Sequence, residues 1–322
     1  MKTRLLLAGF FAISAAHATA QTYPAKPVKL TAPYSAGAGP AVFMRVLAEK
    51  LTKYWEQQVI VDSRPGASGF IAIDAVKNAA PDGYELLVAA NSHMTVNPAI
   101  FRDRLPYDPQ KDFAPVATVF LTPFFITVKS DGPLATVPAL IAAAKASPGG
   151  LTYGGPYVGS PSHLGGADFE FRTGTKMTFV PYKDQSQMYV SIANGELSWA
   201  FSTIGSALPL LKAGRLKLLA IGARQRSAAA PDVPTVGEAG GPQGLEVLSW
   251  MALFAPRATS PEIVGKVNAA VARALGEPDV LERMRSFGFE PFISTPAQLA
   301  DLIRADTKTN TALVERIGVK PQ

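Results

Sequence analysis

The sequence alternates, along most of its length, between short apolar segments and longer stretches with helical spacing. In the first third of the chain, residues 28–32, 59–61 and 86–89 read as strands, and residues 42–53 and 71–78 between them read as helices. Turn-forming residues rich in Gly, Pro and Asn separate these segments. Strand–helix–strand repeats of this length predict an α/β fold with parallel sheets and right-handed crossovers.

Two long strand-like runs, Val116–Val128 and Glu246–Phe254, flank a second series of alternating segments. Within that series, helical spacing covers 134–146, and four strands are predicted at 151–153, 179–182, 199–201 and 217–221. Residues 261–274 and 296–316 read as closing helices. We interpret the long runs as hinge strands on which the chain crosses to a second lobe and returns. The alternative is one large doubly wound domain, and composition does not separate the two.

The N-terminal residues have the pattern of a cleaved signal peptide. A basic start, Met1–Arg4, precedes the apolar run Leu5–Ala16, and Ala18-Thr19-Ala20 supplies a cleavage site before Gln21. The alternative is a membrane anchor, but a spanning helix needs about 20 apolar residues. No Cys stands at the cleavage site to carry a lipid. We expect export after removal of residues 1–20, with no direct membrane insertion.

Composition excludes several classes of function. The chain has no Cys, which excludes disulfides, thiolate metal sites and Cys nucleophiles. Of its three histidines, His17 lies in the predicted signal peptide, so only His93 and His163 remain. The formal net charge of +6 is spread along the chain, which suits an anionic small molecule and is not a nucleic-acid footprint. No motif for a metal, a dinucleotide or a P-loop stands where its chemistry requires, so we expect neither metal nor cofactor.

Four loops that follow predicted strands are rich in Gly, Ser and Asn, and each precedes a predicted helix. The start of a helix presents unpaired backbone N–H groups and about half a positive charge, which together attract anions. One such loop is usually an ordinary helix cap, but four of them predict a converging ligand site. The candidate ligand-binding residues are Tyr34, Ser35, Gly37, Ala38, Gly39, Asn91, Ser92, His93, Tyr157, Gly159, Ser160, Ser162, His163, Phe201, Ser202 and Thr203.

Two other functions remain open at this point. One is an exported serine hydrolase that uses Ser160 or Ser162 with His163. Gly159-Ser160-Pro161-Ser162 is not the G-x-S-x-G elbow of such enzymes, and a triad would need an orienting carboxylate, so we expect no catalysis. The other is a ligand sensor that docks on a signalling partner.

Many short stretches, in order and nearly end to end, resemble the substrate-binding receptors of tripartite tricarboxylate transporters, also called the Bug receptor family. Each stretch is weak alone, but their order and spacing are specific. They are Tyr23-Pro24-Ala25-Lys26-Pro27-Val28, Pro33-Tyr34 with Gly37, Asp62-Ser63-Arg64-Pro65-Gly66-Ala67, Ala80-Pro81-Asp82-Gly83-Tyr84, Leu105-Pro106-Tyr107-Asp108-Pro109, Lys111-Asp112-Phe113-Ala114-Pro115-Val116, Val180-Pro181-Tyr182-Lys183, Pro231-Asp232-Val233-Pro234-Thr235-Val236 with Glu238-Ala239-Gly240, and Leu253-Phe254-Ala255-Pro256.

The resemblance implies a periplasmic binding-protein architecture of two α/β lobes that close on a small carboxylate, which is then delivered to membrane transporter subunits. It further implies that backbone N–H groups, hydroxyls and water in the four loops hold the ligand. We expect a monomer with a first lobe of residues 21–120 and 250–322 and a second lobe of 121–249.

The sequence departs from the family pattern where carboxylates are common. The first loop of the family usually reads Pro-Gly-Gly-x-x-Asp, whereas here Ala41 replaces the acid. A second-lobe loop of the family often has Asp where this chain has Ser202 or Thr203. The loss of these acids removes the partner for a ligand ammonium group, which favours an aromatic or dicarboxylic acid over an amino acid.

Overall fold

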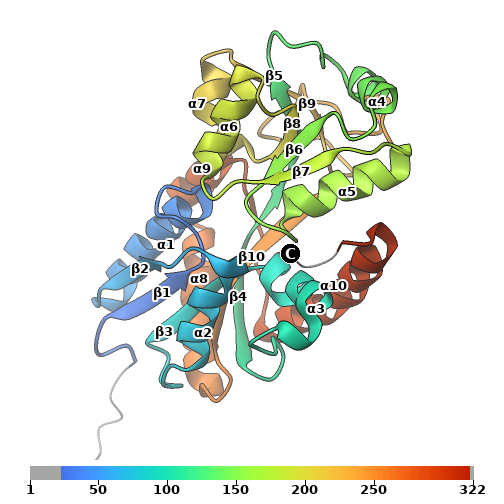
Figure 1. Ribbon diagram of the computed structural model, residues 1–322. Coiled ribbons are helices and arrows are strands. Elements are labelled where there is room, and N and C mark those ends of the chain that lie inside the picture. The colour runs from blue at the N-terminus through green and yellow to red at the C-terminus, as the bar shows by residue number, and fades with distance from the viewer. Residues whose placement is uncertain (1–22, 320–322) are drawn as a thin grey trace, which may run out of the picture.

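The fold is described for residues 23–319 in a computed structural model (Figure 1). It consists of two β-sheets, each with its own layers of helices, and the predicted two-lobed α/β architecture is confirmed. The predicted signal peptide, residues 1–20, lies outside the described residues. Between residues 23 and 319, no helix combines the length and the apolar character needed to cross a membrane.

The first sheet has six strands in the order β11-β4-β10-β3-β1-β2. Strands β1, β2 and β3 are parallel, and β10 pairs antiparallel with both β3 and β4. The bounds are β1 Val28–Ala32, β2 Val59–Ser63, β3 Glu85–Ala90, β4 Phe113–Pro123, β10 Leu248–Pro256 and β11 Glu290–Pro291.

Helices cover both faces of this sheet, and for that reason its central strand β3 is apolar from Leu86 to Ala90. In β3, Leu86 and Val88 pack on the face covered by α1 and α8, while Leu87 and Ala89 pack on the face covered by α2 and α10. All four side chains are fully buried. The helices of this lobe are α1 Gly39–Trp55, α2 Phe70–Lys77, α3 Asn97–Phe101, α8 Pro261–Leu275, α9 Pro278–Phe287 and α10 Pro296–Ile317, with short turns η1 Ala67–Gly69, η2 Ser92–Val96 and η3 Arg102–Arg104.

The second sheet has five strands in the order β7-β6-β8-β5-β9. Strands β6, β7 and β8 are parallel, and β5 pairs antiparallel with β8 and β9. Trp199, Phe201 and Phe169 lie at the centre of its core. The elements are β5 Phe125–Lys129, α4 Val137–Ala146, β6 Thr152–Gly155, α5 Pro161–Thr173, β7 Thr178–Pro181, α6 Gln185–Asn194, β8 Trp199–Ser202, α7 Ile204–Lys212 and β9 Leu216–Ile221.

The chain crosses between the sheets at two points that lie side by side. The predicted run 116–128 is two strands in two sheets, β4 and β5, joined at Phe124. The return crossing precedes β10, where Val247 accepts a hydrogen bond from the N–H of Phe124 at 3.0 Å. Each sheet is therefore mixed rather than wholly parallel, because a chain that leaves along one strand and returns along another must reverse direction. Helix α9 and the π-helical turn η2 were not predicted from the sequence, and the lobe boundaries at 120 and 250 stay a prediction.

Candidate ligand-binding site

A cavity of about 430 Å³ lies between the two sheets. The first lobe lines it with the loops that follow β1, β2 and β3, and the second lobe with the loops that follow β6, β7 and β8. All six are at the carboxyl ends of parallel strands, where open α/β sheets bind ligands. The lining residues are Pro33, Tyr34, Ser35, Ala38, Pro40, Pro65, Gly66, Ala67, Ser68, Gly69, Ala90, Ser92, Phe120, Thr122, Phe124, Pro156, Tyr157, Pro161, Ser162, Lys183, Gln185, Thr203, Ser206, Ser249, Met251 and Phe289.

The chemistry of this lining is apolar and polar, with almost no charge. Phe120, Phe124, Met251 and Phe289 form apolar walls, and hydroxyl groups come from both lobes. Among the lining residues, all of which fall in the described range 23–319, Lys183 alone is charged, and no carboxylate is present. A cavity whose one charged side chain is a lysine offers no partner to a cationic group of a ligand and does not repel an anionic group.

Helices α1, α2, α5, α6 and α7 begin at the cavity. The first N–H of α2 donates back to the carbonyl of Ala67 in η1, and two of the other four helices leave their first N–H groups without a side-chain cap. The uncapped helices are α1, whose N-cap is Ala38, and α7, whose N-cap is Thr203. The start of α5 is capped by Ser160 and that of α6 by Asp184. Free N–H groups at a helix start require a partner, and an anion satisfies both the N–H groups and the helix dipole.

A strained loop after β2 forms another part of the wall. Four consecutive residues have positive φ: Gly66 at 115°, Ala67 at 45°, Ser68 at 51° and Gly69 at 90°. Such backbone in non-Gly residues costs free energy and persists where surrounding contacts enforce it. Here Asn97 enforces it, since its Nδ2 donates to the carbonyl of Ser68 at 3.1 Å. Sequence reasoning identified this segment only as a turn, although two glycines directly after a parallel strand were a usable signal.

His93 lies beneath this loop and does not line the cavity. The N–H of Ala90 donates to its Nδ1 at 3.1 Å, and burial lowers the pKa of His93 to about 4. A Cβ atom at Gly69 would lie 2.5 Å from the imidazole Cδ2, so the ring and the loop are in close contact. The neutral ring acts as a support for the strained loop.

His163 has the same arrangement in the second lobe. The N–H of Gly159 donates to its Nδ1 at 3.0 Å, and burial lowers its pKa to about 4. The hydroxyl of Ser162 donates to the carbonyl of Phe201 at 2.7 Å, and that of Ser160 accepts from the N–H of His163. In the described part of the chain, neither serine hydroxyl is hydrogen-bonded to an imidazole, so the geometry of a serine hydrolase is not formed.

The structure brings all four predicted loops together, but only part of each reaches the cavity. Ser202 is hydrogen-bonded to Thr127 inside the second lobe, and Asn91 accepts from the hydroxyl of Ser249 at 2.8 Å. Phe201 is fully buried in the second core. The predicted residues that line the cavity are Tyr34, Ser35, Ala38, Ser92, Tyr157, Ser162 and Thr203. The predicted residues that lie beside or beneath it are Gly37, Gly39, Asn91, His93, Gly159, Ser160, His163, Phe201 and Ser202.

One contact between the lobes lies at the edge of the cavity, and we call it the cavity-edge contact. The hydroxyls of Ser92 and Tyr157 are 3.0 Å apart and hydrogen-bonded, and burial raises the pKa of Tyr157 to about 12. Beside them Gly159, with φ at 86°, packs so closely that a Cβ atom would lie 2.7 Å from Cδ1 of Ile100. This contact contains no charged group.

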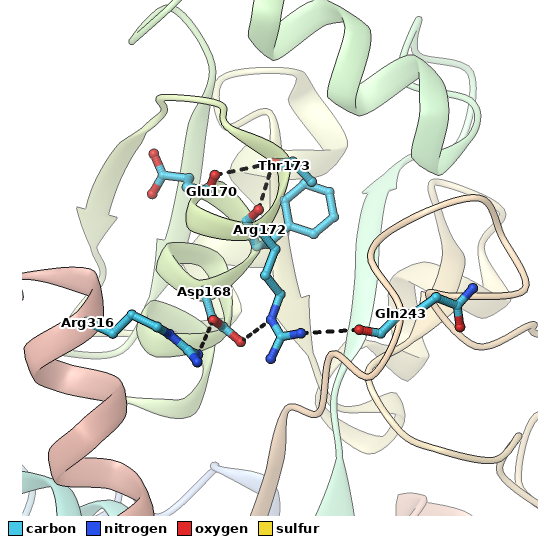
Figure 2. A network of polar contacts seen from close by, with 7 residues as sticks. Asp168, Glu170, Arg172, Thr173, Gln243 and Arg316 are labelled. Atoms are coloured by element: carbon cyan, nitrogen blue, oxygen red, sulfur yellow. Dashed lines mark hydrogen bonds and ion pairs between the residues drawn. The ribbon is translucent and has the colours of Figure 1, made fainter.

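A second contact joins helix α5 to the end of helix α10, and we call it the α5–α10 contact (Figure 2). The buried carboxylate of Asp168 accepts from Nε of Arg172 at 2.8 Å and from a guanidinium nitrogen of Arg316 at 2.6 Å. Leu164 of α5 and Val314 of α10 pack together in an adjacent apolar cluster. Because α10 packs on β4 of the first sheet, this charged contact also ties the two lobes together.

Two α/β lobes, two adjacent crossings and a cavity at the carboxyl ends of the strands define the class of periplasmic solute-binding proteins. The chain belongs to the tripartite tricarboxylate transporter family receptors, whose profile matches residues 43–319. It is 33% identical to protein BugT of Bordetella pertussis over 322 residues, which cover 99% of this chain and 98% of BugT.

Solved structures of similar proteins have the same fold. Rpa4515 of R. palustris with adipate is 31% identical, with a TM-score of 0.88 over 93% of this chain and 100% of that one. MatC of Rhodopseudomonas palustris with bound malate is 29% identical, with a TM-score of 0.84 over 91% of this chain and 100% of that one. The resemblance stated from the sequence is confirmed. The family is one of receptors, so the chain is a solute-binding receptor and not an enzyme.

Proposed function

We propose that the protein is an exported periplasmic receptor that captures an aromatic or dicarboxylic acid between its lobes and delivers it to the membrane subunits of a tripartite transporter. The observation that carries this proposal is the character of the cavity. Its lining contains no carboxylate within the described residues, it contains the single cation Lys183, and two uncapped helices begin at it.

The uncapped helix starts favour a carboxylate. The uncapped N–H groups lie in the first turns of α1 and α7, which belong to opposite lobes, so one anion held between them would favour the closed arrangement. An α-amino acid would bring its ammonium group into a cavity without an anionic partner, and its desolvation would stay uncompensated. Apolar walls at Phe120, Phe124 and Phe289 suit a hydrocarbon chain or an aromatic ring. The adipate and malate in the similar structures support this class of ligand.

We further propose that the protein is a monomer with a first lobe of residues 21–120 and 250–322 and a second lobe of 121–249. Closure would then be a rotation about the crossings at Phe124 and Val247. Small-angle scattering with and without a tight ligand should show compaction at saturation. A radius of gyration that stays the same at saturation would oppose closure.

Calorimetric titration tests the choice of ligand. The panel is adipate, terephthalate, benzoate, glutamate and aspartate, titrated into the protein purified without its first 20 residues. We expect adipate or terephthalate to bind most tightly. Tightest binding of glutamate or aspartate would contradict the proposal, and so would release of a chemically altered ligand.

A further inference from the structure

Lys183 stands at the edge of the second sheet, beside the loop that follows β6. Strands β6 and β7 are parallel with Gly155 opposite Pro181, and the N–H of Tyr182 donates to the carbonyl of Gly155 at 2.9 Å. The pairing thus continues for one residue beyond β7 and places Lys183 next to Pro156, where both line the cavity.

Hydrogen bonds fix the backbone on either side of Lys183, while its ammonium group forms no ion pair with any described residue. After it, the carboxylate of Asp184 accepts from the N–H of Ser186 at 2.8 Å and caps α6. That carboxylate is therefore engaged at the helix start, and it does not line the cavity. Within residues 23–319, no carboxylate lies within 4 Å of the Lys183 ammonium group. A cation at a cavity without carboxylates is available to the ligand alone.

The cavity therefore offers two different environments for negative charge. The first consists of neutral backbone N–H groups in the first turns of α1 and α7, together with the hydroxyls of Thr203 and Ser206, and these act through direct hydrogen bonds. The second is a full charge on the flexible stem of Lys183. A ligand with one carboxylate needs only the first environment, and Lys183 can then remain in water at no cost.

On the basis of the proposed function, we infer that Lys183 is the residue that selects dicarboxylates over monocarboxylates by pairing with the second carboxylate. The side chain is exposed at the rim, so solvent screens the pair until the lobes close. For a charge-assisted contact of this kind, we expect about a tenfold contribution to affinity. Lysine reaches several positions at the rim, which accommodates dicarboxylates of different length.

The test compares matched pairs of acids that differ by one carboxylate: adipate with hexanoate, and terephthalate with benzoate. Lys183→Gln should weaken adipate and terephthalate binding about tenfold and change hexanoate and benzoate binding less than threefold. Lys183→Arg, which keeps the charge, should keep most of the preference for dianions. Lys176→Gln, an exposed lysine of the same lobe outside the cavity, controls for the loss of one charge.

Two results would overturn the inference in distinguishable ways. If the wild-type protein prefers dianions and Lys183→Gln keeps that preference, the role of Lys183 is wrong while the proposed function stands. If the wild-type protein binds none of the four acids, the proposed function fails, and the inference fails with it. Melting temperatures of the three variants should stay within about 2 °C of wild type, because exposed substitutions away from special features change stability little.

Discussion

The cavity-edge contact and the α5–α10 contact both join the lobes, and they differ in chemistry. The cavity-edge contact is a neutral hydrogen bond between Ser92 and Tyr157 beside close packing at Gly159. The α5–α10 contact has a buried carboxylate, Asp168, shared by two guanidinium groups. A neutral hydrogen bond contributes about 0.5–1.5 kcal/mol and a charged one about 1.5–3 kcal/mol. The weak contact is beside the cavity in which we propose that the ligand binds, where a receptor must open at each capture, and we expect the charged contact to persist through that motion.

Acid should weaken the cavity side of the molecule. Burial holds the pKa of both His93 and His163 at about 4, below the value of about 6.5 in an unfolded chain. Between these two pH values the unfolded chain binds protons that the folded chain does not, so the free energy of unfolding falls as the pH is lowered from about 6.5 to 4. Above about pH 6.5 the free energy of unfolding keeps the full contribution of the two neutral histidines. We expect a fall of about 2–3 kcal/mol per histidine in urea titrations.

His163→Gln removes one of the two titrating rings and should remove about half of this decline. A free energy of unfolding that stays constant between pH 7 and pH 4.5 would show that neither ring is held neutral by the fold.

Asp168→Ala should lower stability more than affinity. The substitution leaves Arg172 and Arg316 facing each other without their shared carboxylate. Both guanidinium groups are partly exposed, so we expect a loss of about 2–3 kcal/mol rather than the full penalty of a broken buried pair. Asp301→Ala, which breaks an exposed pair with Arg304, is the matched control and should cost under about 0.5 kcal/mol. A Kd that rises tenfold while stability is unchanged would reverse the roles assigned to the two contacts.

Gly159→Ala should lower affinity, because its methyl group would collide with Ile100 as the lobes meet. A positive φ costs about 1–2 kcal/mol for any alanine. The control must therefore be a glycine that also has a positive φ but has no neighbour for the added methyl group to meet. Gly174, at the opposite end of α5, has φ at 63°, and a Cβ atom added there would meet nothing within 4 Å. We expect about a tenfold higher Kd for Gly159→Ala and an unchanged Kd for Gly174→Ala, by calorimetry. Equal Kd values in the two variants would mean that packing at Gly159 does not limit closure.

Tyr157→Phe should have the smallest effect. It keeps the ring and removes only the hydroxyl bound to Ser92, so the Kd should rise about threefold. Ser92→Ala should give a similar change, and the double variant should add little to either one. Fully additive changes would show that the two hydroxyls act independently.

The sequence was informative where its patterns are local. Apolar strands and turn residues predicted nearly every strand, and the carboxyl ends of parallel strands meet at one edge, so the four loops could be placed together. Which strand side chains reach the cavity depends on register. Phe120 and Met251 line it while their neighbours Leu121 and Trp250 pack on the other face, and the pairing of β4 with β10 shifts after Met251.

Contacts between distant residues left no local signal. Asp168 and Arg316 are 148 residues apart, and Asn97 supports Ser68 through a bond across 29 residues. Lys183 stood in a stretch already recognised as typical of the family, but a single lysine after a strand does not indicate that it faces a cavity. That the described residues lining the cavity include no carboxylate became visible only when both lobes were in place.

The strand order of the first sheet has a consequence for the sequence of folding events. Strand β10, which lies between β3 and β4, is separated from β4 by the whole second sheet along the chain. The second sheet uses only residues 125–221, so its pairings close shorter loops and should form earlier. A chain made from its N-terminus cannot join β3 to β4 through β10 until residue 256 has been added, and the first sheet is complete only at residue 291, with β11. Hydrogen exchange on stalled nascent chains should therefore protect the later-synthesised sheet before the earlier one.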